Sequence, residues 1–347
     1  MKRKGGWLPL AAAGLGLFIA ARQYVRRRKE LELTGKVVLI TGGSRGLGLA
    51  LAEEFARRGC RLILCARNEA ELEQAREKLA KLGAEVVVLP CDVSRREQVQ
   101  DLVRQALELF GRIDVLVNNA GIITVGPLQV QTIADFEEAL SIMFWGTVYT
   151  TMEVLPAMQE RQSGHIVNIT SIGGKASVPH LLPYSSAKFA QLGFSEGLQA
   201  EVARDGIHVL TVVPGLMRTG SHVNALFKGK HKVEYTMFSL LDTLPFTSIS
   251  ARRAAYLIVR ATCKGQTELI ISWQALLLAA FHGLFPGLTV GILGKVAALL
   301  PRTSGSSDEE ERKPGKESSS ALSSSFLTTL GQQAAREYNQ QGTAVSG

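Results

Sequence analysis

Short apolar runs alternate with amphipathic stretches between residues 31 and 272. The apolar runs lie at 37–40, 61–65, 86–89, 115–117, 165–170 and 208–213. The stretches between them, such as 69–82, place charged residues on one side, as helices that cover a sheet do. Strands that alternate with helices predict a parallel sheet with helices on both faces. We therefore expect an α/β fold built on a doubly wound, three-layer parallel sheet of the Rossmann type.

The N-terminal 30 residues have a different pattern. Residues 7–21 are apolar and uncharged, with basic residues at 2–4 before them and at 26–29 after them. A spanning helix needs about 20 residues, which this stretch reaches only if Arg22 extends its charge to the interface. A cleaved signal peptide is the alternative, but 20–22, Ala-Ala-Arg, is a poor cleavage site. We favour an uncleaved membrane helix, with the main domain on the cytoplasmic side.

The C-terminal third departs from the alternation. Residues 221–250 are irregular, which is typical of a lid. Residues 268–272 resemble a last strand, and 269–294 contain no Asp, Glu, Lys or Arg. This apolar segment fits a helical hairpin dipping into a bilayer, a second span, or a buried helix. We expect an anchor with basic flanks at 1–30 and a catalytic domain at 31–272. An apolar helical segment that can associate with a membrane follows at 273–301, and a disordered tail at 302–347.

A glycine-rich turn follows the first apolar run. Residues 41–48 read Thr-Gly-Gly-Ser-Arg-Gly-Leu-Gly, with glycines at Gly42, Gly46 and Gly48. A turn between a strand and a helix can hold a phosphate against backbone N–H groups and the positive end of the helix. The spacing differs from the dinucleotide fingerprint G-x-G-x-x-G, and glycine also closes ordinary turns, so the turn alone is weak evidence.

Two arginines suggest which nucleotide such a turn would hold. Arg45 lies inside the turn, and Arg67 follows the second strand, where NAD-preferring sheets carry an acidic residue. Guanidinium groups bind phosphate well, so this pair predicts NADP(H) in preference to NAD(H). Asp92, after the third strand, can accept a hydrogen bond from an adenine amino group. Residues 118–121, Asn-Asn-Ala-Gly, are small enough to let the chain pass close to a cofactor.

The candidate chemistry lies at Tyr184 and Lys188. If residues 184–188 open a helix, both side chains share one face. A free tyrosine titrates near pH ~10, and a neighbouring ammonium favours its phenolate, so Tyr184 could act as a general acid or base. Ser171, which ends the strand before this helix, can hydrogen-bond a substrate oxygen. Tyrosine and lysine at this spacing are common by chance, so the pair gains meaning only from the rest of the chain.

Together these features resemble the short-chain dehydrogenase/reductase family over residues 33–272. The motifs that carry the resemblance are 41–48, Asp92-Val93, 118–121, Ser171, Tyr184-x-x-x-Lys188 and 214–219. The family transfers a hydride between a nicotinamide cofactor and a carbonyl or alcohol. In that scheme Tyr184 exchanges the substrate proton, Ser171 polarises the substrate oxygen, and Lys188 holds the nicotinamide ribose and lowers the pKa of the tyrosine.

The resemblance also implies a set of cofactor contacts. These are Gly42, Ser44, Arg45, Gly46, Leu47, Gly48, Arg67, Asp92, Val93, Asn119, Ala120, Gly121, Tyr184, Lys188, Pro214, Gly215, Met217 and Thr219. Asn119 would line the adenosine side of the pocket, and 214–219 would hold the nicotinamide amide. Family members often associate through helices equivalent to 136–158 and 184–204, which implies a homodimer or homotetramer.

One position departs from the family pattern. Met143 stands where the family usually carries an asparagine, at the start of an Asn-x-x-Gly pattern. That asparagine is credited with holding a water that relays protons to the lysine, and a methionine side chain cannot hold it in this way. Either other groups rebuild the relay, the enzyme is slow, or turnover has been lost.

Charge, cysteine and histidine content argue against nucleic-acid binding and metal binding. The net charge of +8 comes mostly from the basic residues before position 30, which flank an apolar stretch and so favour a membrane surface over nucleic acid. The four cysteines and six histidines show no metal spacing. The leading hypothesis is a membrane-anchored NADPH-dependent carbonyl reductase or alcohol dehydrogenase that acts on a lipophilic substrate. The alternative is a nucleotide-binding membrane protein that lost turnover at Met143.

Overall fold

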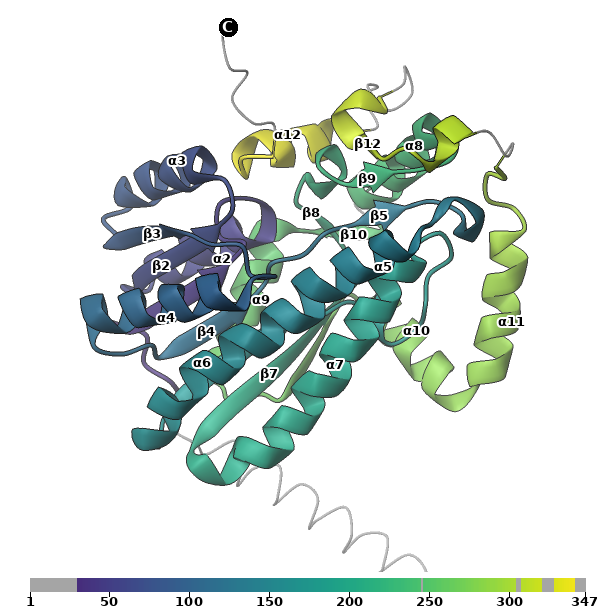
Figure 1. The fold of residues 1–347 in the computed structure, drawn as a ribbon. Helices are drawn as coiled ribbons and strands as arrows, with labels where there is room; N and C mark the ends of the chain where they lie inside the picture. Colours follow the sequence, from purple (N-terminus) through teal and green to yellow (C-terminus); the bar gives the residue numbers. More distant parts are fainter. Residues whose placement is uncertain (1–29, 245, 304–306, 320–327, 341–347) are drawn as a thin grey trace, which may run out of the picture.

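The structure is a computed structural model that describes residues 30–244, 246–303, 307–319 and 328–340 (Figure 1). Except for residue 30, the expected N-terminal anchor lies outside the described residues. Within the described ranges, no helix has both the length and the apolar character needed to cross a bilayer. The described fold begins at residue 30.

A seven-stranded sheet forms the centre of the molecule, and every pairing in it is parallel. Its strands are β1 (Val37–Thr41), β2 (Arg61–Ala66), β3 (Val86–Pro90), β4 (Val115–Asn118), β6 (Gly164–Ile169), β7 (Ile207–Pro214) and β11 (Glu268–Ile271). They lie in the order β11-β7-β6-β4-β1-β2-β3. The chain winds outward from β1 in both directions, so the expected doubly wound parallel sheet is confirmed, including its last strand.

Helices cover both faces of the sheet (Figure 1). One face is covered by α2 (Gly46–Ala56), α3 (Glu69–Ala80) and α9 (Ala251–Cys263), and the other by α4 (Arg96–Phe110), α6 (Gly146–Glu160) and α7 (Leu182–Val202). Alternate side chains of β1 enter the two cores: Val38 and Ile40 join the first, and Val37 and Leu39 the second. Burying both faces of a strand requires a continuous apolar run, which is the pattern that predicted it.

The edge at the carboxyl ends of the strands positions the candidate site. The winding direction reverses between β1 and β4, and parallel sheets bind ligands outside this switch point. The glycine-rich turn follows β1, residues 118–121 begin at the end of β4, and Ser171 follows β6. The topology therefore brings the glycine-rich turn and Ser171 to one edge, although they are more than 120 positions apart in the sequence.

The helical segment at 133–160, which includes the association helix implied at 136–158, contains a π-helical turn. The segment consists of α5 (Ile133–Ala139), the π turn Leu140–Trp145, and α6. A π turn adds one residue to a helical turn and is frequent at functional sites. Met143, the position that departs from the family pattern, lies inside it and is fully buried.

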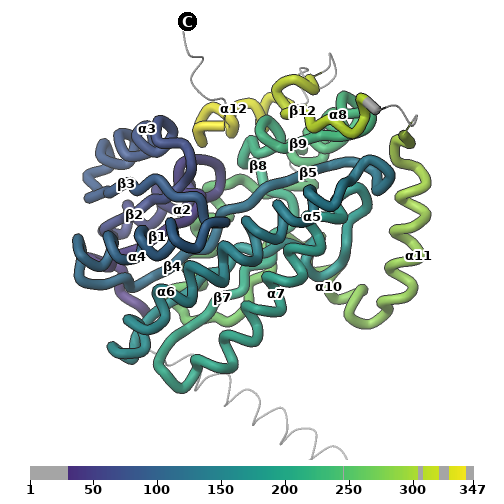
Figure 2. Tube along the Cα trace, viewed as in Figure 1, coloured from purple at the N-terminus to yellow at the C-terminus, as the bar shows by residue number. Residues whose placement is uncertain are grey.

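Residues 221–250, expected to form an irregular lid, are partly regular. They contain α8 (His231–Thr243) and the short strands β9 (Leu226–Phe227) and β10 (Ser248–Ser250). Two further short strands, β5 (Thr124–Val125) and β8 (Leu216–Arg218), pair with β9 and β10 respectively. Small sheets outside the central one thus shape the region above the strand ends (Figure 2).

The apolar segment 273–301 forms a helical hairpin. Its helices are α10 (Trp273–Leu284) and α11 (Pro286–Ala297), each of 12 residues, and the figures show them projecting beside α7 (Figures 1 and 2). At 1.5 Å per residue each helix is about 18 Å long, so neither can be the second span considered from sequence. The hairpin also is not a buried helix, because most of its large apolar side chains are exposed.

Parts of the tail expected to be disordered are folded. Beyond residue 302 the described residues contain β12 (Lys313–Pro314), which pairs with β9, and α12 (Thr329–Glu337). Ala334, Ala335 and Tyr338 are buried, and Tyr338 joins the core beside α2 and α3. The expectation of disorder is therefore wrong for 328–340, because these few apolar side chains find a long-range packing site that the polar composition hides. It is also wrong for 307–319, where β12 pairs with β9 and Arg312 forms an ion pair with Asp135 at 2.7 Å.

Candidate functional site

The structure brings Ser171, Tyr184 and Lys188 together. Tyr184 and Lys188 lie in the first two turns of α7, which has a proline near its start. Lys188 Nζ is 5.8 Å from the centroid of the Tyr184 ring, and a β-carbon on Gly173 would lie 3.4 Å from both the Ser171 hydroxyl oxygen and Tyr184 Cε1. Ser171 is held at the end of β6, where its hydroxyl accepts the Gly173 N–H at 3.0 Å. The geometry therefore places a serine, a tyrosine and a lysine within one small site.

The electrostatics of this site differ from the sequence expectation. Burial raises the pKa of Tyr184, and the nearby Ser171 hydroxyl opposes that rise. Burial also lowers the pKa of Lys188 to about 7, so its amine is only partly charged at neutrality. The expected lowering of the Tyr184 pKa by Lys188 is therefore wrong for this structure: a half-charged amine does not outweigh the desolvation of the phenol.

Lys188 is held by two acceptors and by a chain of hydrogen bonds. Its Nζ donates to the Ile169 carbonyl at 2.7 Å and to the Gln191 side-chain oxygen at 2.9 Å. The Gln191 amide donates to the Thr147 hydroxyl at 2.8 Å, which donates to the Met143 carbonyl at 2.8 Å. Sequence reasoning missed Gln191 and Thr147, since their contacts join α7 to α6 and leave no local signal.

The glycine-rich turn has the backbone shape that its glycines permit. Gly42 and Gly46 have φ of +62° and +57°, a region that favours glycine. A β-carbon on Gly48 would lie 2.1 Å from the Gly42 carbonyl oxygen, so only glycine allows α2 to begin this close to the turn. Leu47, between the last two glycines, is buried.

Asn119 supports this turn from β4. Its side-chain amide donates to the carbonyls of Thr41 at 3.0 Å and Gly42 at 3.1 Å. The Thr41 hydroxyl accepts the backbone N–H groups of Asn119 and Ala120 at 3.0 and 3.1 Å. A β-carbon on Gly42 would lie 3.0 Å from the Ala120 α-carbon. Residues 119 and 120 thus brace the turn, a structural role beside the adenosine contact that the resemblance implies.

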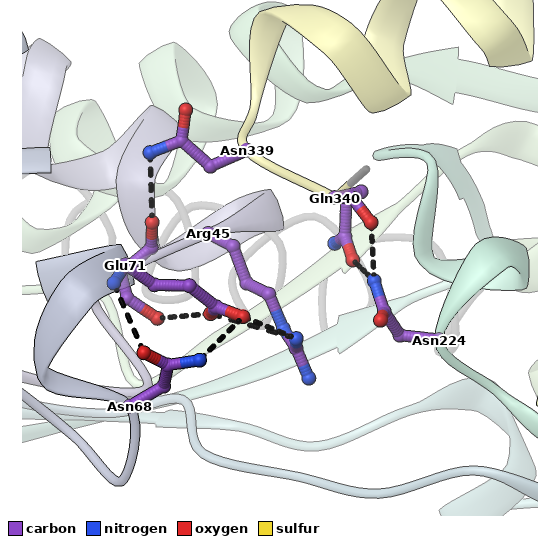
Figure 3. Close-up of polar contacts among 7 residues, drawn as sticks. Arg45, Asn68, Glu71, Asn224, Asn339 and Gln340 are labelled. Atoms are coloured by element: carbon purple, nitrogen blue, oxygen red, sulfur yellow. Dashed lines mark hydrogen bonds and ion pairs between the residues drawn. The ribbon is translucent and has the colours of Figure 1, made fainter. Parts of the chain in front are cut away.

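The two arginines of the expected NADP site are arranged differently. Arg45 forms an ion pair with Glu71 at 3.1 Å, and Ser44 donates a hydrogen bond to the same carboxylate at 3.2 Å (Figure 3). Arg67 follows the end of β2 and is exposed to solvent. The structure therefore keeps a basic pair beside the turn, with one member already neutralised by a carboxylate.

The remaining predicted contacts lie at the same edge of the sheet. The Asp92 carboxylate accepts the Ser94 hydroxyl at 2.7 Å, and buried Val93 packs against Gly146. Thr219 lies across from the turn, with its β-carbon 4.0 Å from where a Gly46 β-carbon would stand. The other predicted contacts are Gly121, beside Met143, Pro214 at the end of β7, Gly215 after it, and Met217 in β8.

A cavity of about 690 Å³ lies between the α10–α11 hairpin and the start of α7. Its walls come from the segment after Ser171, from residues 126–129, and from the α10–α11 hairpin, and they include Val178, Leu182, His282, Val290, Leu293 and Ala297. Leu182 stands two positions before Tyr184, so the cavity adjoins the catalytic helix. Within the residues that the structure describes, no cluster of three or more potential metal ligands occurs.

Two named proteins are similar in sequence to part of this chain. The chain is 40% identical over 225 residues to a "Dehydrogenase/reductase SDR family protein 7-like" of Anopheles gambiae, covering 63% of this chain and 71% of that protein. It is 36% identical over 242 residues to "11-beta-hydroxysteroid dehydrogenase A" of Sesamum indicum, covering 68% of each chain.

Solved structures share the fold. A short-chain dehydrogenase/reductase from Burkholderia phymatum, in complex with NAD, matches with a TM-score of 0.68 and 25% identity over 74% of this chain and 96% of that one. L-Sorbose reductase from Gluconobacter frateurii, complexed with NADPH and L-sorbose, matches with a TM-score of 0.63 and 26% identity over 70% of this chain and 97% of that one. These neighbours support a nicotinamide cofactor.

The family itself is shown by a model that covers more than half of the chain. Residues 36–227 match the family described as short chain dehydrogenase. This range contains the glycine-rich turn, Ser171, Tyr184 and Lys188, which the fold places at one edge of the sheet. The protein is an oxidoreductase that acts on CH–OH groups, and it belongs to the short-chain dehydrogenase/reductase family.

Proposed function

We propose that this protein is an NADP(H)-dependent carbonyl reductase or alcohol dehydrogenase that acts on a lipophilic substrate at a membrane surface. The observation that carries the proposal is the cavity between the α10–α11 hairpin and the catalytic helix. One side of it is the exposed apolar hairpin, and the other includes residues 177–180 and Leu182, which lie between Ser171 and Tyr184 in the sequence. A substrate that partitions into lipid would reach the site through this wall.

The hairpin has the composition of a surface that contacts lipid. Its most exposed large side chains are Trp273, Leu284, Val290 and Leu299, at 66, 74, 62 and 85% exposure. Contiguous exposed apolar surface of this kind is costly in water and marks an interaction site. Helices of 12 residues suit insertion into one leaflet's interface. Such a surface, together with the basic N-terminal segment, is what supports the membrane part of the proposal.

The preference for NADP(H) rests on Arg45 and Arg67. Arg45 lies inside the turn, and Arg67, rather than an acidic residue, is the first residue after β2, the place from which NAD-preferring sheets contact the ribose 2′-hydroxyl. Arg45 is paired with Glu71, and a phosphate would compete with that carboxylate for the guanidinium. The bound cofactor supplies or accepts the hydride.

Tyr184, Ser171 and Lys188 would perform the proton chemistry. The Ser171 hydroxyl and the Tyr184 phenol, which both lie against Gly173, would both donate to the substrate oxygen in reduction. The raised pKa of Tyr184 keeps the phenol protonated, which suits a general acid. Lys188, next along α7, would hold the ribose and return a proton toward Tyr184.

Kinetics with matched substrates test this proposal. The purified full chain in detergent is given NADPH or NADH with a long-chain ketone, a steroid ketone, and a small water-soluble ketone. We expect turnover with NADPH on at least one apolar ketone and a higher kcat/KM for it than for the small ketone. Equal kcat/KM for apolar and small ketones, or preference for NADH, would contradict the corresponding part of the proposal.

A further inference from the structure

Gln191 occupies a position that the catalytic motif leaves unspecified. It lies three residues after Lys188 on α7, is fully buried, and its amide joins Lys188 to Thr147 on α6. A side-chain amide has both an N–H donor and a carbonyl acceptor, and each needs a hydrogen-bond partner when the amide is buried. Here the oxygen accepts from the lysine and the nitrogen donates to the threonine, so both polar atoms of the amide are used.

The side chain of Met143 takes no part in this chain of hydrogen bonds. Its side chain is fully buried beside Gly121, with the sulfur 3.6 Å from where a Gly121 β-carbon would stand, and offers no strong hydrogen bond. Only its backbone carbonyl takes part, by accepting from Thr147. The polar chain therefore runs from Lys188 through Gln191 and Thr147 to the backbone of the π turn, and bypasses the side chain at position 143.

We propose that Gln191 and Thr147 are positioning residues that hold the Lys188 amine and rebuild the polar link lost at Met143. This inference rests on the proposed reductase function, in which Lys188 acts next to Tyr184. The titratable side chain recorded beside Lys188 is Tyr184, on α7; β6 contributes the Ile169 carbonyl, and Thr147 of α6 contacts Gln191. Gln191 is thus the side chain through which the charge of Lys188 can be tuned.

Substitutions at Gln191 test this assignment. Gln191→Leu removes the acceptor, and Gln191→Glu keeps it and adds a negative charge. Ser195→Ala is the matched control, because Ser195 is a buried polar residue of the same helix whose recorded partners are Asn168 and Thr211. Two quantities are measured against pH in the full chain: the Kd of NADPH by fluorescence, and kcat on the best ketone.

We expect Gln191→Leu to lower kcat about tenfold or more, the size of a lost hydrogen bond to a charged group, and to move the loss of NADPH affinity to lower pH. Gln191→Glu should move it to higher pH, because a carboxylate stabilises the ammonium. Ser195→Ala should leave both profiles in place. If the Gln191 variants show wild-type profiles, or if Ser195→Ala shifts them equally, the assignment is wrong. The binding profile remains decisive even if no ketone turns over, which separates this inference from the proposed function.

A second observation concerns the C-terminal segment 328–340, which lies on the glycine-rich turn (Figure 3). The Gly46 N–H, first of α2, donates to the Tyr338 carbonyl at 2.9 Å, and the Asn339 amide donates to the Ser44 carbonyl at 3.2 Å. A β-carbon on Gly46 would lie 2.6 Å from the Gln340 side-chain nitrogen. The open face of this glycine, which lets a pyrophosphate approach in such folds, is therefore covered by Gln340.

The contact is anchored on both sides of the turn. Tyr338 is 2% exposed, and Lys78 Nζ lies 5.2 Å from its ring centroid. On the other side, the Asn224 amide donates to the backbone and side-chain oxygens of Gln340 at 2.7 and 2.6 Å (Figure 3). Two independent anchors, one apolar and one polar, show that the segment docks at a specific place.

We infer that residues 338–340 occupy the phosphate-binding face of the turn and that cofactor binding displaces them. Hydrogen exchange of the full chain tests this: adding NADPH should speed exchange of the amides at 331–340. Asn339→Ala/Gln340→Ala should lower the Kd of NADPH severalfold, and Gln333→Ala, on the exposed side of α12, should not change it. Slower exchange with NADPH, or weaker binding by the double variant, would overturn the inference and make the segment a wall of the bound cofactor's pocket.

Discussion

Lys188 Nζ lies 5.8 Å from the centroid of the Tyr184 ring, one helical turn further along α7. Burial acts on the two groups in opposite directions: it raises the pKa of the tyrosine and lowers that of the lysine to about 7. Both shifts favour the neutral forms. The phenol of Tyr184 is therefore protonated near neutral pH, and a protonated Lys188 can return a proton to the phenolate that remains once Tyr184 has donated its own.

Cofactor preference should depend on Arg67. Arg67→Asp removes a guanidinium and places a carboxylate where the ribose 2′-position would lie, so NADPH should lose affinity about tenfold or more and NADH should gain relative to it. Arg204→Asp is a control, since the Arg204 side chain is 90% exposed at the other end of the sheet. The ratio of kcat/KM for the two cofactors is measured. A ratio that stays at the wild-type value would remove Arg67 from the 2′-phosphate site.

Restoring asparagine at position 143 should have a conditional effect. Because Gln191 already contacts Lys188, Met143→Asn alone should change kcat little and should lower stability, since it buries a polar group and loses packing beside Gly121. In the Gln191→Leu background the same substitution should recover part of the lost rate. A higher rate for Met143→Asn alone would instead mean that the proton relay is impaired in the natural sequence.

The exposed hairpin should enter a lipid surface. A fluorescent probe on Leu284→Cys, at the end of α10, should shift its emission to the blue when vesicles are added. The control is Leu109→Cys on α4, an exposed leucine on another part of the surface, at 56% exposure against 74% for Leu284. The comparison of the two positions isolates the hairpin from the N-terminal segment. Equal emission shifts at both positions, or none at either, would contradict membrane contact by the hairpin.

Acid should destabilise the fold through His165. Burial, with His208 nearby, lowers the pKa of His165 from 6.5 to about 4. Between these values the unfolded chain binds a proton that the folded protein does not, so stability falls as pH drops from 6.5 to 4, by up to about 3 kcal/mol. His165→Asn should flatten this part of the profile of Tm against pH. An unchanged slope in that window would show that other groups control the acid transition.

The sequence predicted the central sheet because its strands are buried on both faces and read as continuous apolar runs. It did not predict β5, β8, β9, β10 and β12, which have two or three residues each and carry too little pattern. Helix α9 was also missed, although Ser250 caps it by accepting the Arg253 N–H at 3.3 Å. The capping serine is a local helix signal, but it lies at the end of the irregular stretch 221–250, where no helix start was expected.

The candidate site divides in the same way. Ser171, Tyr184 and Lys188 follow from spacing, because their places depend on one strand end and one helix face. Gln191 depends on a partner 44 positions away, and Tyr338 on a packing site formed by α2 and α3. Such contacts are tertiary, so no local pattern records them. The lowered tyrosine pKa was wrongly expected because desolvation of the pair is invisible in the sequence.

The central claim is that Tyr184 is the general acid of a reductase, and Tyr184→Phe tests it most directly. NADPH oxidation and alcohol formation are followed together, for wild type and variant, on the ketone that the wild type reduces fastest. We expect one alcohol formed per NADPH consumed by the wild type, and a loss of about 10²–10⁴-fold in kcat for the variant with nearly unchanged NADPH affinity. Retained turnover in Tyr184→Phe would contradict the central claim.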